Sequence, residues 1–184
     1  MHFKTHSELE GLHSFLSPSN YHWLNYTPEK LVSVYKHQKQ KEEGTVLHNF
    51  AAMAIQKRIK LAKIKRALNM FVNDAIGFKM TPEQVLYYSH NSFGTADAIS
   101  FRENLLRIHD LKTGISKPSF KQLHIYAALF CLEYDINPED IFMELRLYQG
   151  TGYEVDIPDG AYIRDVMNII VEFDGVLEDY KKTI

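Results

Sequence analysis

Two aspartates and a lysine near the middle of the chain have the types and spacing needed to hydrolyse a phosphodiester bond. Asp110 and Lys112 are two positions apart in the strand-like segment 105–112, so their side chains point to the same face of a sheet. Asp97 belongs to a preceding candidate strand, 95–101, and a short polar turn would place the two strands side by side. Converging carboxylates repel each other unless a cation lies between them, so we expect a divalent metal ion there. Because a metal ion, a lysine and water can hydrolyse a phosphodiester, the chain is predicted to cut nucleic acid.

This pattern also has an ordinary explanation, since an Asp-x-Lys pair on a strand is usually a solvated face or an ion pair. The largely apolar segment Leu105–Ile108 favours an interior strand, in which unpaired charges are costly. Glu83 could add a carboxylate beyond the immediate metal ligands, although Thr81-Pro82-Glu83 equally fits the start of a helix. Both explanations therefore stay open at this point.

Three histidines near these residues are expected to have structural rather than chemical roles. His109 adjoins Asp110 but points to the opposite face of the strand, where it is packed or exposed. His90 is expected in a solvated loop, and His124 on the surface of a helix. We therefore expect none of the three to bind a metal ion.

The composition is that of an ordinary globular protein, with 184 residues, of which 45% are hydrophobic and 24% charged. This length fits a single domain over residues 1–184. The single cysteine, Cys131, excludes an intramolecular disulfide and a cysteine metal cluster, and it suits a reducing compartment. No apolar run is long enough to span a bilayer, and residues 1–6 lack the apolar stretch of a secretory signal. We therefore expect a cytoplasmic protein without a membrane partner.

The formal net charge of −2 is not typical of a nucleic-acid-binding protein, but the basic residues are unevenly distributed. No acidic residue occurs between Glu43 and Asp74. This interval contains a basic strip of six residues: Lys57, Arg58, Lys60, Lys63, Lys65 and Arg66. The strip could follow a phosphate backbone, with Lys57, Arg58 and Lys60 contacting substrate, or it could be a solvated helix face.

Local patterns predict helices on either side of a central group of strands, which is an α/β layer fold. Caps and apolar spacing place helix starts at Ser17-Pro18, Thr27-Pro28, Gly44 and Asp159-Gly160, a further helix after Pro118, and a helix end near Gly77. Short apolar or alternating runs predict strands at 85–88, 95–101, 105–112 and 141–148.

Four motifs occur in order along the chain: Gly44-x-x-x-His48, Gly94-x-x-Asp97, Asp110-x-Lys112-Thr113 and Gln122-x-x-x-Tyr126. Together with the start Ser17-Pro18-Ser19, this order resembles the RecB-type nucleases of the PD-(D/E)xK superfamily, which are related to CRISPR-associated and lambda-type exonucleases. The resemblance covers residues 16–148. It implies a restriction-endonuclease-like core, in which a central mixed β-sheet is flanked by helices.

The resemblance also implies roles for individual residues. The ligands of an Mg²⁺ or Mn²⁺ ion would be His48, Asp97, Asp110 and the main-chain carbonyl of Leu111. Lys112 would position the attacking water or stabilise the charge that develops on phosphorus. Gln122 and Tyr126 lie four apart on one helix face, where they would help to hold DNA or the catalytic residues. They could equally form a satisfied hydrogen bond in the core.

Many RecB-type nucleases hold an iron–sulfur cluster with four cysteines, which this chain cannot supply. The resemblance is therefore to phage or mobile-element enzymes without that cluster. It implies a metal-dependent DNA nuclease, an exonuclease, that acts in DNA recombination or end processing. The expected partners are DNA, a recombination or single-strand-annealing protein and further copies of the chain. The alternatives are a catalytically silent DNA-end-binding or anti-defence protein on the same fold, and a structural subunit of a larger complex.

Overall fold

The computed structural model describes residues 14–16, 18–114 and 117–183. Ser17, in the predicted Ser-x-Ser start, and residues 1–6, on which the absence of a secretory signal was argued, lie outside these ranges. The chain divides into two compact units, Met1–Glu43 and Gly44–Ile184. The expectation of one nuclease domain over residues 1–184 stays a prediction.

The first unit contains a short 3₁₀ helix, η2 (Pro18–Asn25), and the first part of the long helix α1 (Pro28–Gln56). Both helices begin where the two proline signals predicted. At the second signal, Thr27 Oγ1 accepts a hydrogen bond from the Lys30 backbone N–H at 3.3 Å, so Thr27 caps α1.

The prediction that a separate helix starts at Gly44 was wrong, because α1 continues through this glycine without a break. Ion pairing supports the helix just before it, where Lys39 Nζ lies 2.7 Å from a Glu42 carboxylate oxygen. The apolar spacing after Gly44 is real, but it belongs to the second half of one long helix. Gly44 itself is buried, which indicates close packing rather than a helix start.

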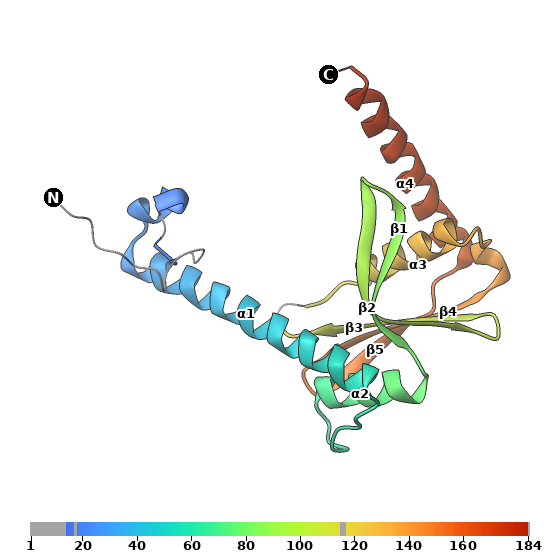
Figure 1. Cartoon of the computed structure of the whole chain (residues 1–184), viewed down its shortest axis with the longest axis horizontal. Coiled ribbons are helices and arrows are strands. Elements are labelled where there is room, and N and C mark those ends of the chain that lie inside the picture. Colours follow the sequence, from blue (N-terminus) through green and yellow to red (C-terminus); the bar gives the residue numbers. More distant parts are fainter. Residues whose placement is uncertain (1–13, 17, 115–116, 184) are drawn as a thin grey trace, which may run out of the picture. The chain divides into compact units, whose positions relative to one another are not determined.

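The second unit is built on a five-stranded mixed sheet whose strands follow chain order, β1-β2-β3-β4-β5 (Figure 1). Strands β3 and β4 run parallel, and all other neighbours are antiparallel. The strands are β1 (Thr81–Ser89), β2 (Ser92–Arg102), β3 (Leu105–Lys112), β4 (Phe142–Gln149) and β5 (Gly152–Asp156). Four of them lie where sequence patterns predicted strands, whereas β5 was missed. It is a short edge strand of largely exposed residues, which carries little apolar signal.

Helices cover both faces of the sheet, which confirms the expected α/β class. Helix α3 (Lys121–Glu133) connects the parallel strands β3 and β4, and it packs on one face with α4 (Gly160–Lys181) around Leu106 and Ile108. Helix α2 (Ala67–Gly77) and the end of α1 pack on the other face around Leu111. A 3₁₀ turn, η3 (Pro138–Asp140), precedes β4.

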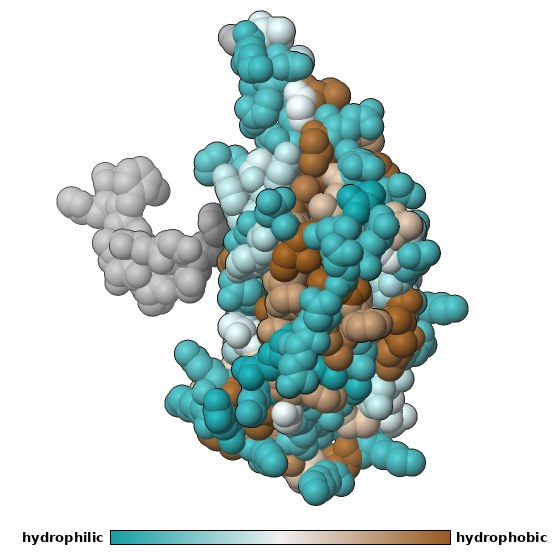
Figure 2. Space-filling model, turned by 90° about the vertical axis from the view of Figure 1, so that its right-hand side faces the viewer, coloured by the Kyte–Doolittle hydropathy of each residue, from teal (hydrophilic) through white to brown (hydrophobic). Residues whose placement is uncertain are grey.

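Helix α4 starts as its sequence predicted, because Asp159 accepts a hydrogen bond from the Ala161 backbone N–H at 3.1 Å. Apolar side chains of α4 remain partly exposed, and Figure 2 shows apolar surface on the side of the molecule that carries this helix. Within the described ranges, no helix combines the length and apolarity needed to cross a membrane.

Candidate active site

The two aspartates predicted to converge lie on neighbouring antiparallel strands. Asp97 is in β2 and Asp110 is in β3, next to the backbone pair Ala98–His109. Asp97 Oδ2 accepts a hydrogen bond from the Leu111 backbone N–H at 2.8 Å, which holds the Asp97 carboxylate across the strand pair. The sheet register thus places both carboxylates at one end of β3.

Asp110 is almost fully buried, with 3% of the residue exposed. Burial, and after it the nearby Asp97 charge, raise the pKa of Asp110, because both disfavour its ionised form. Lys112 opposes this shift, since its Nζ lies 3.1 Å from Asp110 Oδ1 and 2.9 Å from Oδ2. Asp110 is therefore ion-paired, as the ordinary explanation of the Asp-x-Lys pattern expects, but the pair lies in a buried place rather than on a solvated strand face.

A chain of hydrogen bonds connects Lys112 to helix α3. Lys112 Nζ donates to Gln122 Oε1 at 2.7 Å, and Gln122 Nε2 donates to the Tyr126 hydroxyl at 3.1 Å. Gln122 and Tyr126 lie one helical turn apart, as their spacing predicted. The pair is therefore hydrogen-bonded internally and also positions the lysine ammonium.

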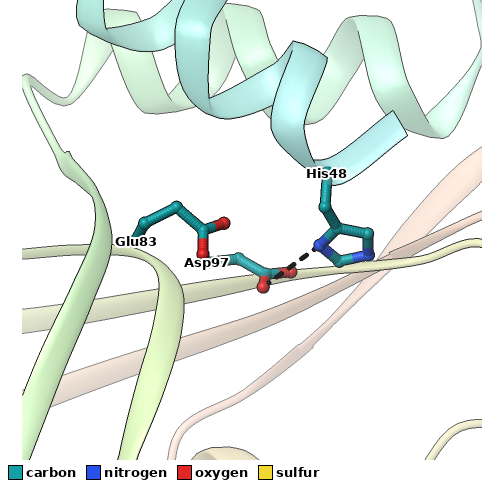
Figure 3. A group of neighbouring side chains, drawn as sticks. All are labelled: His48, Glu83 and Asp97. Atoms are coloured by element: carbon teal, nitrogen blue, oxygen red, sulfur yellow. Dashed lines mark ion pairs between the residues drawn. The ribbon is translucent and has the colours of Figure 1, made fainter. Parts of the chain in front are cut away.

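His48 comes from α1 and approaches Asp97 from the helix side of the site. Its Nδ1 lies 3.2 Å from Asp97 Oδ1, as the dashed line in Figure 3 shows. This hydrogen bond raises the pKa of His48 against the opposing effect of burial, because the neighbouring carboxylate stabilises the imidazolium. The contact with Asp97 thus favours the protonated form of His48.

Glu83 lies beside these two side chains, and sequence reasoning left its role open. The helix start proposed for Thr81-Pro82-Glu83 is wrong, because these residues belong to β1. Glu83 has a positive backbone φ of 49°, which is unusual for a residue within a strand. Ligand atoms of His48, Glu83 and Asp97 all lie within 4.8 Å of one another, so this group could hold a metal ion (Figure 3).

Two motif glycines allow close approach of neighbouring side chains. A Cβ atom at Gly44 would lie 2.7 Å from Thr113 Oγ1, and one at Gly94 would lie 2.9 Å from Tyr126 Cε1. Ordinary contacts of this kind begin near 3.4 Å, so any larger residue would displace its neighbour. The glycines of two separate motifs therefore let α1 and β2 approach residues of the other two motifs.

Most of the residues predicted for the site, although not Tyr126, line one cavity of about 370 Å³. Its walls include the side chains of His48, Asp97, Asp110, Lys112 and Gln122, together with Leu111. The basic strip does not line it within the described ranges of the chain. Lys57 and Arg58 follow the end of α1, whereas Lys60, Lys63 and Lys65 line a different depression with Asn73 and Asp74.

Two further histidines, His109 and His124, have structural partners. His109 is fully buried on the opposite sheet face, with Nδ1 3.3 Å from the Tyr148 hydroxyl. His124 was expected on a helix surface, but 13% of its side chain is exposed and its Nε2 lies 2.7 Å from Asp156 Oδ2. That partner belongs to β5, the strand that the sequence patterns missed.

Comparison of the chain with known protein families, with curated proteins and with solved structures finds no match.

Proposed function

We propose that the chain is a metal-dependent DNA nuclease with a RecB-type site on a restriction-endonuclease-like core. The observation that carries the proposal is the shared cavity. His48, Asp97, Asp110, Lys112 and Gln122 come from two helices and two strands, yet they line one space. These residue types are the ones that phosphodiester hydrolysis with a divalent metal requires.

The donor set suits a hard or borderline divalent cation. Asp97 and Asp110 offer carboxylate oxygens, and His48 offers an imidazole nitrogen, which together are compatible with Mg²⁺ or Mn²⁺. Asp110 Oδ2 is buried and lies 2.9 Å from Lys112 Nζ, but it accepts no hydrogen bond from the described part of the chain, so it retains lone pairs that can face a cation. The Leu111 carbonyl is proposed as a further oxygen ligand. A bound cation would supply Lewis-acid polarisation of the phosphodiester and make water more acidic.

The protein's own groups would do the remaining chemistry. Lys112 carries a positive charge at the cavity wall, where it can orient the attacking water and offset negative charge that develops on phosphorus. Gln122 holds this ammonium by the 2.7 Å hydrogen bond, so the lysine does not depend on Asp110 alone for its position. The Asp97 carboxylate is oriented by the Leu111 N–H before any ligand arrives.

The proposal extends to an exonuclease that acts in recombination or end processing, with DNA, an annealing protein and other copies of the chain as partners. Linear DNA should therefore be degraded with Mg²⁺ or Mn²⁺, whereas closed circular DNA should resist. Chelation of the metal should stop cleavage of linear DNA. Cutting of both forms would instead indicate an endonuclease.

Variants Asp110→Ala and Lys112→Ala should lose cleavage while they keep the fold. Both residues lie at a strand end, where truncation removes charge more than core volume. Asp165→Ala is the matched control, because this exposed aspartate lies on α4 away from the cavity lining. Full activity in purified Asp110→Ala protein would refute the assignment. Binding of DNA ends without cleavage by the unmodified protein would identify the silent DNA-binding alternative.

A further inference from the structure

Glu83 lies at the edge of the proposed site in a backbone conformation that glutamate rarely adopts. Its neighbours Pro82 and Gln84 pair normally with Ala98 and Ala96 across the sheet, yet Glu83 between them has a φ of 49°. A strand residue normally has a strongly negative φ, and a side chain with a Cβ is disfavoured at positive φ. Such conformations persist where the surroundings impose them, and they occur often at functional sites.

Glu83 is an exposed residue, so its carboxylate is accessible to a ligand from solvent. Within the described part of the chain, no hydrogen bond or ion pair involves the Glu83 side chain, although Asp97 is close enough to act on it. Glu83 and Asp97 each place a carboxylate oxygen within 4.8 Å of the other, so two acidic groups share one small space. His48 completes the group, because its ring nitrogen lies within 4.8 Å of both carboxylates.

A second observation at the same place also points to a ligand. Asp110 lines the cavity with His48 and Asp97, and only 4% of its side chain is exposed. Its Oδ2 accepts no hydrogen bond among the described residues, although Lys112 Nζ lies 2.9 Å away and donates to Oδ1 instead. The Lys112 ammonium thus pairs with Asp110 and gives its hydrogen bond to Oδ1, and the buried Oδ2 keeps lone pairs that can face a further cation.

We propose that Glu83 is a direct ligand of the divalent cation, together with His48 and Asp97. The inference rests on the proposed nuclease function and adds to it a ligand that the four motifs do not contain. The Glu83 carboxylate lies beside Asp97 and His48 in the structure, as Figure 3 shows. The ligand class is a divalent ion that accepts carboxylate oxygen and imidazole nitrogen, with Mn²⁺ as the best match.

The test measures Mn²⁺ binding by calorimetry and the melting temperature of the full chain with and without Mn²⁺. Glu83→Gln removes the charge and keeps the shape, and Glu83→Gly removes the side chain and permits the positive φ. Both variants should bind Mn²⁺ at least tenfold more weakly than the unmodified protein. Without metal, Glu83→Gly should melt at the same temperature or higher, because the strained conformation suits glycine.

Glu103 offers a matched control, because it also has a φ of 49° but lies exposed in the turn between β2 and β3. Glu103→Gly should raise the melting temperature in the same way and leave Mn²⁺ binding unchanged. Unchanged Mn²⁺ binding in both Glu83 variants, or no Mn²⁺ binding by the unmodified protein, would overturn the ligand assignment. So would a marked loss of metal-free stability in both variants, which would indicate a structural role.

Parallel cleavage assays separate this inference from the proposed function. An unmodified protein that binds Mn²⁺ through Glu83 but cuts no DNA would refute the nuclease and support the ligand. A protein that cuts DNA while its Glu83 variants bind Mn²⁺ normally would support the nuclease and refute the ligand.

Discussion

Replacing Gly94 with alanine should destabilise the protein through one contact, that with Tyr126. The new Cβ would lie 2.9 Å from Tyr126 Cε1, about 0.5 Å inside ordinary contact, so the ring or strand β2 must move. Overpacking of this kind costs about 1–3 kcal/mol. Alanine also restricts the unfolded chain more than glycine does, which stabilises the folded protein by about 0.5–1 kcal/mol. We therefore expect a net loss of about 0.5–2 kcal/mol in the free energy of unfolding.

A double-mutant cycle isolates the contact. In a Tyr126→Ala background the obstacle is gone, so Gly94→Ala should be neutral or slightly stabilising, and the coupling energy should reach about 1–3 kcal/mol. Urea unfolding of the four proteins without metal measures it. Gly152→Ala is the control, because a Cβ at this strand glycine meets nothing within 4 Å and should not destabilise. Additive effects within about 0.5 kcal/mol would refute the packing argument.

The same substitution should also reduce DNA cleavage. Tyr126 holds Gln122, and Gln122 holds the Lys112 ammonium, so a displaced ring should weaken the position of the lysine. DNA cleavage by Gly94→Ala should then fall more than its stability alone explains. Normal cleavage by well-folded Gly94→Ala protein would show that this chain of hydrogen bonds does not position Lys112.

Three further predictions concern metal choice, DNA contacts and pH. His48→Ala should reduce the ratio of the Mn²⁺ to the Mg²⁺ cleavage rate, because Mn²⁺ accepts imidazole more readily; an unchanged ratio would indicate oxygen ligands only. Neutralising Lys57 and Arg58 should flatten the salt dependence of DNA affinity by about 0.7–0.9 in log–log slope per lost contact, whereas an unaltered slope would assign the basic strip to solvent. Burial lowers the pKa of His109 to about 3, so from pH 6.5 downward the unfolded chain binds a proton that the folded protein excludes. Between pH 7 and pH 5 the free energy of unfolding should therefore fall by about 2 kcal/mol more in the unmodified protein than in His109→Gln. Parallel curves of unfolding free energy against pH for the two proteins would contradict this.

Local patterns predicted the elements that carry their own signals. Thr27 and Asp159 cap α1 and α4 as their side chains indicated, because an N-cap needs only a short polar side chain and the first free N–H groups. Strands β2 and β3 were predicted from their composition. The two-residue periodicity of strand side chains correctly placed Asp110 and Lys112 on one face. By contrast, β5 has exposed residues and forms because β4 pairs with it, so its own sequence carries little signal.

Two errors share a physical cause, since both treated a local signal as sufficient. The glycine at position 44 suggested a helix start, but packing against Thr113 requires a small residue there and α1 runs on. The Pro82-Glu83 pair suggested another helix start, but pairing with β2 keeps the segment in the sheet. In each case tertiary contacts outweighed a modest local preference.

The amino-acid sequence by itself determined which residue types were present and which of them share a face of one element. It placed Asp110 beside Lys112 and Gln122 beside Tyr126, because spacing within a strand or helix determines such neighbours. Only the tertiary structure decided that Asp110 is buried, that His48 approaches Asp97 from α1, and that Glu83 turns toward both. These relations join segments far apart in the chain, and they depend on strand register, glycine contacts and desolvation, which exist only once the sheet and helices are packed.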